Sequence, residues 1–410
     1  MRILFLTNFY PPASRGGYEQ WCQEVAEGLR SRSDHVVVLT SKFGREQLKH
    51  PEPVWIRREL HLEMEIASPR NILNFFVSRK TREKENIHQL RKIVEEFKPD
   101  FIMIWGMWNL HRSLPALAEK LMPGKTVYYM GDYWPTLPDQ FEEYWKSPPR
   151  NFFASIPKLL LKPAAQAILS REKRQGLKFE RMLFPSAFME DEFKQKRIVL
   201  QHTKVIYGAI DTSPYLNLQK KPNVVLSLLY VGRLTHGKGV HTAIEAVRVL
   251  VHEHDFKDLK LTIIGNGEPD YEASLHALVK QENIESLVTF LPAQPKEALP
   301  ALYQQADIFL FTSIWSEPFG RVIVEAMASE LAVVGAPVGG AAEILVEGKN
   351  ALTFIPADPA SLARQLLRLI ESPAYRLQLA KAGRETALNK FDIQRMTTQI
   401  KTYLETLVKP

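Results

Sequence analysis

The 410-residue sequence has only one cysteine, Cys22, and no long apolar run. One cysteine excludes an internal disulfide and is typical of a reducing compartment. The most apolar stretch, near Phe101–Trp108, is far too short to cross a bilayer. The short apolar run Met1–Leu6 predicts a first strand rather than a secretory leader. We therefore expect a cytoplasmic protein without a membrane span.

Acidic residues are in deficit, with 46 Asp and Glu against 53 Lys and Arg, which gives a net charge of +7. This balance favours an anionic partner or surface. The basic residues are spread along the chain and form no recognised nucleic-acid-binding module, so we expect no nucleic acid among the partners.

A complete dinucleotide-binding fingerprint is also absent. Gly265-Asn-Gly267 follows a predicted strand, but Asp270 stands where a third glycine would be needed. We interpret the two glycines as a turn beside a ligand crevice. A nicotinamide oxidoreductase remains an alternative that this observation weakens.

Strand-like and helical patterns alternate along the chain. The strand Arg2–Thr7, the helix Tyr18–Arg30 and the strand Val36–Thr40 predict a βαβ unit. A second series of the same kind begins at Val224. The sequence therefore predicts an α/β fold with two domains.

The stretch Ser313–Ala328 predicts a strand–loop–helix turn, with the helix starting near Phe319. A helix start presents unpaired N–H groups that suit a phosphate or a sugar oxygen. Glu317 and Glu325 bracket this start. A plainer interpretation is that Glu317 caps the helix and that Glu325 is a surface acid paired with Arg321.

The loop Gly232–Gly239 combines glycines with two cations at the carboxyl end of a predicted strand. Arg233 can hold phosphate oxygens in two-point geometry, and Lys238 adds a compact charge. Such crevices bind ligands in open α/β sheets. Taken alone, a basic surface turn is the simpler interpretation.

Glu317-Pro-Phe-Gly-Arg-Val-Ile-Val-Glu325 resembles the Glu-x7-Glu signature of the retaining glycosyltransferases with the GT-B fold, the family called GT4. The loop Tyr10–Gly17 resembles the N-terminal glycine loop of that family, and Gly232–Gly239 stands upstream in the order that the family shows. The resemblance covers nearly the whole chain and is strongest from Tyr230 to Gly348.

The resemblance implies the GT-B fold, with two Rossmann-like domains facing across a nucleotide-sugar cleft. It places an acceptor-side domain in residues 1–208 and a donor domain in residues 209–385. Residues 386–410 are then a C-terminal helix that crosses back to the first domain.

The resemblance also implies the site residues. The catalytic set is Glu317, Arg233, Lys238 and Asp132. The donor-binding set is Gly16, Gly17, Gly232, Arg233, Lys238, Leu291, Ala293, Glu317, Phe319, Gly320, Arg321, Val322 and Glu325. Gly131 stands where the family often has a histidine, which removes a histidine-based role and leaves Asp132 as a polar contact to acceptor or sugar.

The function that this resemblance implies is retaining transfer of a hexose from a nucleoside diphosphate sugar, preferably a UDP-sugar such as UDP-glucose. The acceptor would be a saccharide or a lipid-linked molecule in polysaccharide biosynthesis. No Asp-x-Asp motif occurs, so we expect no metal and no cofactor, with Arg233 and Lys238 in place of a metal. Open alternatives are a nucleotide-sugar 2-epimerase, a GDP-mannose-dependent mannosyltransferase and a non-catalytic sugar-binding protein.

Residues 145–181 interleave apolar residues with an excess of cations, among them Arg150, Lys158, Lys162, Lys173 and Arg174. A basic amphipathic segment can lie on an anionic membrane surface. A solvated helix against the domain core is the simpler interpretation. Peripheral contact with the inner face of a membrane is a further expectation.

Overall fold

The computed structural model describes residues 1–13, 16–48, 50–66, 68, 70–148, 152–172, 176–217 and 223–408, and for residues 152–155 only the backbone. Ser14 and Arg15 of the predicted glycine loop lie outside the described residues, as do Arg150, Lys173 and Arg174 of the basic segment. The chain divides into two compact units. The first unit comprises Met1–Pro185, Glu190–Ile206 and Thr397–Pro410, and the second comprises Ser186–Met189 and Tyr207–Met396.

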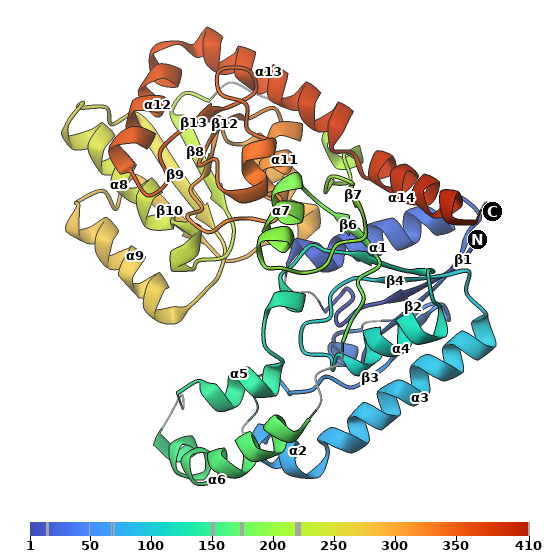
Figure 1. Ribbon diagram of the computed structural model, residues 1–410. Helices are drawn as coiled ribbons and strands as arrows, with labels where there is room; N and C mark the ends of the chain where they lie inside the picture. The colour runs from blue at the N-terminus through green and yellow to red at the C-terminus, as the bar shows by residue number, and fades with distance from the viewer. Residues whose placement is uncertain are drawn as a thin grey trace. The chain divides into compact units, whose positions relative to one another are not determined.

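The first unit is built on seven parallel strands in the order β3-β2-β1-β4-β5-β6-β7 (Figure 1). The strands are β1 (Arg2–Leu6), β2 (His35–Ser41), β3 (Ile56–Leu60), β4 (Phe101–Ile104), β5 (Thr126–Tyr129), β6 (Arg181–Phe184) and β7 (His202–Val205). Ile3 of β1 is in register with Val36 on one side and with Phe101 on the other. β4 and β5 are buried along their whole length, as expected of strands covered on both faces.

Helices cover both faces of this sheet, with α1 on one face and α3 and α4 on the other (Figure 1). The helices are α1 (Gly17–Arg30), α2 (Asn71–Val77), α3 (Arg79–Phe97), α4 (Ser113–Leu121), α5 (Gln140–Lys146), α6 (Phe152–Arg171) and α7 (Ala187–Gln195). The short helices α2 and α5 pack with α6 into a separate small cluster, in which Phe75 contacts Phe141 and Trp145.

The C-terminal helix α14 (Ile393–Val408) begins in the second unit and continues as part of the first. Thr397 lies against Gly28 of α1, where an added Cβ would come within 3.0 Å of its hydroxyl. Lys401 Nζ forms an ion pair with Asp34 Oδ2 at 2.8 Å. The predicted return of the chain end to the first sheet is therefore confirmed.

The second unit has six parallel strands in the order β10-β9-β8-β11-β12-β13. They are β8 (Leu226–Val231), β9 (Leu259–Ile264), β10 (Val288–Leu291), β11 (Ile308–Phe311), β12 (Ala332–Gly335) and β13 (Leu352–Thr353). Its helices are α8 (Val240–His252), α9 (Pro269–Gln281), α10 (Leu299–Gln304), α11 (Arg321–Ala328), α12 (Pro359–Glu371) and α13 (Pro373–Lys390). The strand order reverses between β8 and β11, so the loops that follow these two strands flank a ligand-binding crevice of the open-sheet type.

The helix predicted from Phe319 begins instead at Arg321. Gly320 precedes it with φ 114°, a conformation that ends any continuation of helical geometry toward the N-terminus. None of the helices in the described part of the chain has both the length and the apolar character needed to cross a membrane.

Candidate active site

The loops that follow β8 and β11 are joined by hydrogen bonds. The N–H groups of Ile314 and Trp315 both donate to the carbonyl of Gly237, each at 3.0 Å. The hydroxyl of Thr312 donates to the carbonyl of Lys238, also at 3.0 Å. The two loops that the sequence predicted as parts of one ligand site therefore form a single structure.

Lys238 and Glu317 meet where these loops join. Lys238 Nζ forms an ion pair with Glu317 Oε1, and the same oxygen accepts a hydrogen bond from Ser313 Oγ at 2.9 Å. Gly239 has φ 64°, and a Cβ there would lie 2.1 Å from the carbonyl oxygen of Thr312. Only glycine allows the close approach that places Lys238 beside Glu317.

A third loop, after β12, holds the backbone of Glu317. Gly340 N–H donates to the Glu317 carbonyl at 2.7 Å. Gly339 has φ 59°, and a Cβ at this position would lie 2.4 Å from the same carbonyl oxygen. The hydroxyl of Ser186 donates to the neighbouring carbonyl of Pro318 at 2.6 Å. These contacts hold the backbone of Glu317 in place, and its carboxylate forms the ion pair with Lys238.

Glu325 is buried in α11 and is bonded through both carboxylate oxygens. Arg321 Nε lies 3.2 Å from its Oε1, and the hydroxyl of Tyr303 donates to its Oε2 at 3.1 Å. The plainer interpretation correctly predicted the Arg321–Glu325 pair but wrongly placed it on the surface. Glu317 does not cap the helix, because the N-cap residue is Gly320 and the cap has no side-chain hydrogen bond.

Arg233 is exposed, and its carbonyl accepts a hydrogen bond from the buried hydroxyl of Tyr230 at 3.0 Å. Burial raises the pKa of Tyr230, with the charge of Glu317 adding to the rise and that of Arg233 opposing it. Tyr230 therefore lies close to both charged residues. The structure records no ion pair between the Arg233 guanidinium and any described residue, which leaves that cation available to an anionic ligand.

The loops after β8, β9 and β10 lie against one another at the same edge of the sheet. Gly265 N–H donates to the carbonyl of Leu291 at 3.0 Å, and a Cβ on Gly265 would lie 1.8 Å from the carbonyl oxygen of Gly232. The N–H of Ala293 donates to Asn266 Oδ1 at 2.9 Å. The Gly-Asn-Gly turn thus lies beside three of the predicted donor-binding positions.

Two further predicted residues flank the start of α11. Phe319 is buried, and its ring packs edge-on against Phe391 with centroids 5.4 Å apart. Val322 is half-buried in the first turn of the helix. A direct role in binding stays a prediction for both.

The remaining predicted site residues belong to the first unit. Gly16 N–H donates to Glu19 Oε2 at 3.0 Å, and Gly17 is the first residue of α1. Burial raises the pKa of Asp132 to about 7. A hydrogen bond from Trp134 N–H opposes this rise in pKa, and the charge of Glu19 adds to it. Glu19 is therefore a shared neighbour of the glycine loop and of Asp132.

The position where the family often carries a histidine is covered by an aromatic ring. A Cβ on Gly131 would lie 2.4 Å from the ring of Tyr18. The hydroxyl of Tyr18 donates to the carbonyl of Tyr129, and its ring packs on Trp105 with centroids 5.7 Å apart. These contacts hold Tyr18 where it excludes any side chain at position 131.

Several residues that shape these sites were missed by sequence reasoning. They are Tyr18, Ser186, Tyr230, Tyr303, Gly339 and Gly340. The paired glycines were the one usable signal, because two adjacent glycines often mark close backbone approach. Tyr18, Ser186 and Tyr303 contact the site from segments distant in sequence, which no local pattern reveals, and Tyr230 reaches Arg233 three residues along the chain.

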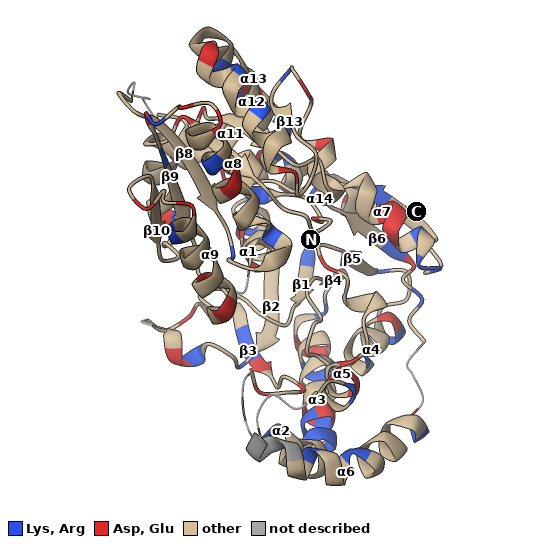
Figure 2. Cartoon of the chain, turned by 90° about the vertical axis from the view of Figure 1, so that its left-hand side faces the viewer, with Lys and Arg blue, Asp and Glu red and all other residues tan. Residues whose placement is uncertain are grey.

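Lys and Arg are mixed with Asp and Glu over both units rather than gathered into one basic stripe (Figure 2). Within the residues that the structure describes, no three or more His, Cys, Asp or Glu side chains are grouped so that they could hold a metal ion.

Two sheets of this kind, each with helices on both faces, define a GT-B architecture, and comparison with known proteins agrees. A family model described as Glycosyltransferase Family 4 matches residues 15–214, and one described as Glycosyl transferases group 1 matches residues 214–386. The chain belongs to this glycosyltransferase family.

Solved structures similar over nearly the whole chain share the fold. Anabaena Alr3699/HepE, solved in complex with UDP and glucose, has a TM-score of 0.70 and 23% identity, with 99% of each chain covered. Sucrose-phosphate synthase from Thermosynechococcus elongatus has a TM-score of 0.73 and 17% identity, again with 99% of each chain covered.

Curated relatives match over shorter stretches. Spore coat protein SA of Bacillus subtilis is 29% identical over 228 residues, which cover 50% of this chain and 58% of that protein. Glycogen synthase of Mycobacterium tuberculosis is 32% identical over 216 residues, which cover 52% of this chain and 51% of that protein. The chain thus matches little more than half the length of these relatives.

Proposed function

We propose that this protein transfers a hexose from a nucleoside diphosphate sugar to an acceptor hydroxyl, with the anomeric configuration retained. The observation that carries the proposal is the contact of Lys238 with Glu317 at the switch point of the second sheet, directly before the start of α11. This crevice offers a cation for phosphate, a carboxylate for sugar hydroxyls and the backbone N–H groups at the start of a helix within one small region.

In this proposal Lys238 and Arg233 hold the diphosphate. Negative charge grows on the leaving phosphate as the bond to the sugar breaks, and prepositioned cations stabilise that charge. The two cations take the role that a metal ion has in other glycosyltransferases, so the reaction needs no metal and no cofactor. The exposed guanidinium of Arg233 suits two-point contact with phosphate oxygens.

The donor sugar and ribose are assigned to the acids. Glu317 contacts the sugar ring, together with the backbone N–H groups of Phe319 and Gly320. Glu325 accepts hydrogen bonds from the ribose hydroxyls. The loop that ends at Ala293 contacts the base through its backbone. A UDP-sugar such as UDP-glucose is the preferred donor, and the relation to a UDP-bound GT-B structure supports that choice.

The acceptor is a saccharide or a lipid-linked molecule in polysaccharide biosynthesis. We assign Asp132 as a polar contact to the acceptor or the donor sugar. No residue is placed as a covalent nucleophile, so the acceptor attacks from the face that the leaving phosphate vacates, and that phosphate accepts the acceptor proton.

A thermal-shift screen of UDP-glucose, UDP-N-acetylglucosamine, GDP-mannose and ADP-glucose tests the donor class. We expect stabilisation by a UDP-sugar. Stabilisation by GDP-mannose alone would favour a mannosyltransferase, and conversion of a donor without any acceptor would favour a 2-epimerase. NMR spectroscopy of the transfer product reads the anomeric configuration, and inversion contradicts the proposed mechanism.

We further propose that the protein acts in the cytoplasm at the inner face of a membrane, held there by α2 and α6. Along α6, Lys158 points inward: it is buried, and its Nζ donates to the carbonyl of Ser147 at 2.9 Å. The outward face is apolar instead, with Leu159 64% and Leu160 75% exposed. A solvated helix against the domain core is the alternative interpretation of α6.

The adjacent helix α2 also exposes apolar residues, with Leu73 62% and Val77 69% exposed. From Ile156 to Arg171, α6 contains no carboxylate and three cations, of which Lys158 is buried, so Lys162 and Arg171 favour an anionic bilayer over a neutral one. Sedimentation with vesicles of 70% phosphatidylcholine and 30% phosphatidylglycerol should capture the protein. Changing Leu159 and Leu160 to Ser should release it, whereas the matched change of exposed Leu377 should not.

A further inference from the structure

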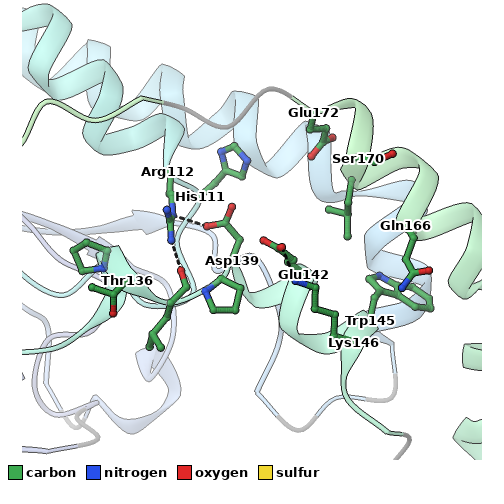
Figure 3. A pocket seen from close by; sticks show the side chains of 14 residues that line it. His111, Arg112, Thr136, Asp139, Glu142, Trp145, Lys146, Gln166, Ser170 and Glu172 are labelled. Carbon is green, nitrogen blue, oxygen red and sulfur yellow. Dashed lines mark hydrogen bonds and ion pairs between the residues drawn. The ribbon is translucent and has the colours of Figure 1, made fainter. Parts of the chain in front are cut away.

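A pocket of about 750 Å³ lies in the first unit, and none of the residues assigned to the donor lines it (Figure 3). The loops that follow β4 and β5 supply Arg112 and Asp139 on one side. Helices α5 and α6 supply Trp145, Gln166 and Ser170 on the other. Pockets of this size enclose small organic ligands or one to a few sugar units.

The charged residues that line this pocket are already neutralised by one another or by neighbours. Arg112 Nε pairs with Asp139 Oδ1 at 2.8 Å, and Lys146 Nζ pairs with Glu142 Oε1 at 2.8 Å. Glu172 accepts from Arg79 on both carboxylate oxygens, at 2.7 and 2.8 Å. An ionic ligand would have to compete with these pairs, so the pocket favours a ligand without net charge.

Neutral hydrogen-bonding groups and apolar groups are both present in the lining. Gln166 and Ser170 are exposed, and no hydrogen bond of the Gln166 amide to a described residue is recorded. Trp145 is fully buried behind the lining, and its Nε1 is closed to solvent. Leu137 and Leu169 add apolar surface.

An uncharged molecule with many hydroxyls and apolar ring faces matches this lining. The loop after β5 also links the pocket to the proposed reaction site, because Asp132 and Asp139 stand at its two ends. Seven residues of extended chain span at most about 25 Å. Asp139 in the pocket lining therefore lies no farther than this from Asp132.

We propose that this pocket binds a neutral sugar unit of a saccharide acceptor, remote from the hydroxyl that reacts. The proposal rests on the proposed transfer function for the role of acceptor, but binding of the saccharide itself does not depend on it. The pocket is then a specificity site: it selects uncharged glycans and leaves the donor chemistry to the second unit.

The test uses the full chain on an array of soluble oligosaccharides. The array carries neutral glucosyl, galactosyl, mannosyl and N-acetylglucosaminyl glycans beside sialylated and sulfated ones. Ser170→Trp fills the pocket from α6. Ala167→Trp is the matched control, because it adds the same side chain to an exposed position of the same helix that does not line the pocket.

We expect wild-type protein and Ala167→Trp to bind at least one neutral glycan, and Ser170→Trp to bind it at least tenfold more weakly. Preference for acidic glycans, absence of glycan binding, or equal binding by both variants would overturn the proposal. UDP-induced thermal stabilisation is measured alongside. If UDP fails to bind while Ser170→Trp still abolishes glycan binding, the transfer function is wrong and the pocket assignment stands. If UDP binds and glycans do not, the pocket assignment is wrong and the transfer function stands.

Discussion

The ring of Tyr18 occupies the space that a side chain on Gly131 would need, with an added Cβ only 2.4 Å from the ring. The ring cannot move freely, since its hydroxyl is bonded to the carbonyl of Tyr129 and it packs, tilted, against the ring of Trp105. A side chain such as histidine at position 131 is therefore incompatible with tyrosine at position 18. We expect the residues at these two positions to vary together among related proteins.

Gly131→Ala should destabilise the protein by about 1–3 kcal/mol, because overpacking displaces the ring and breaks its hydrogen bond. Urea denaturation measures the loss. Tyr18→Ala combined with Gly131→Ala should cost less than the sum of the two single changes. Strict additivity in this double-mutant cycle would show that the two residues do not compete for space.

Gly339→Ala should disturb the site through the backbone of Glu317. Its φ of 59° and the 2.4 Å approach to the Glu317 carbonyl oxygen both exclude a Cβ. We expect a loss of about 2 kcal/mol or more in the free energy of unfolding and weaker donor binding. Gly176→Ala is the control, because nothing lies within 4 Å of a Cβ there. A Gly339→Ala protein as stable as that control would refute the contact.

The hydroxyl of Tyr303 holds the carboxylate that we assign to ribose. Tyr303→Phe removes the 3.1 Å hydrogen bond to Glu325 but keeps the buried ring. Loss of one hydrogen bond to a charged group is worth about 1.5 kcal/mol, or roughly tenfold in the dissociation constant of UDP. Isothermal titration calorimetry measures this dissociation constant, and Tyr375→Phe is the matched control variant. Unaltered UDP affinity in Tyr303→Phe would show that this hydrogen bond does not contribute to nucleotide binding.

Asp132 makes stability depend on pH. Burial raises its pKa from 3.8 to about 7, so the folded protein holds this proton more tightly than the unfolded chain. The contribution of Asp132 to the free energy of unfolding is therefore fully present below pH 4. It decreases as the pH rises from 4 to 7 and is constant above pH 7. Asp132→Asn should remove this pH dependence. The free energy of unfolding of the variant, taken relative to wild type, should therefore be about 2–4 kcal/mol higher at pH 8 than at pH 4. Urea denaturation at pH 4, 5.5, 7 and 8 checks it; parallel curves for the two proteins would contradict the assignment.

The sequence predicted those features of the fold and the site that are encoded locally. Alternating strand and helix patterns predicted both parallel sheets, and the spacing of Lys238 and Glu317 within their loops matched the family order. The pairing of Lys238 with Glu317 follows from topology, because their two loops flank the reversal of strand order.

The parts that could not be predicted depend on contacts between distant segments. Tyr303 reaches Glu325 from another helix, and Ser186 reaches Pro318 across more than a hundred residues. The inward direction of Lys158 was also hidden, because a helix rich in both leucine and lysine can turn either face to the protein. In each case the arrangement is set by side-chain packing, which amino-acid composition does not determine.

The most direct test of the central claim is the rate of UDP release from the best UDP-sugar identified in the thermal-shift screen, with wild type compared to Lys238→Ala. Loss of one prepositioned donor at a developing anion typically lowers kcat by about 10²–10³-fold, and we expect a loss of that size. Lys349→Ala, which removes an exposed lysine of the same unit, should retain full activity. Wild-type rates in Lys238→Ala would contradict the claim that the Lys238–Glu317 crevice holds the leaving diphosphate.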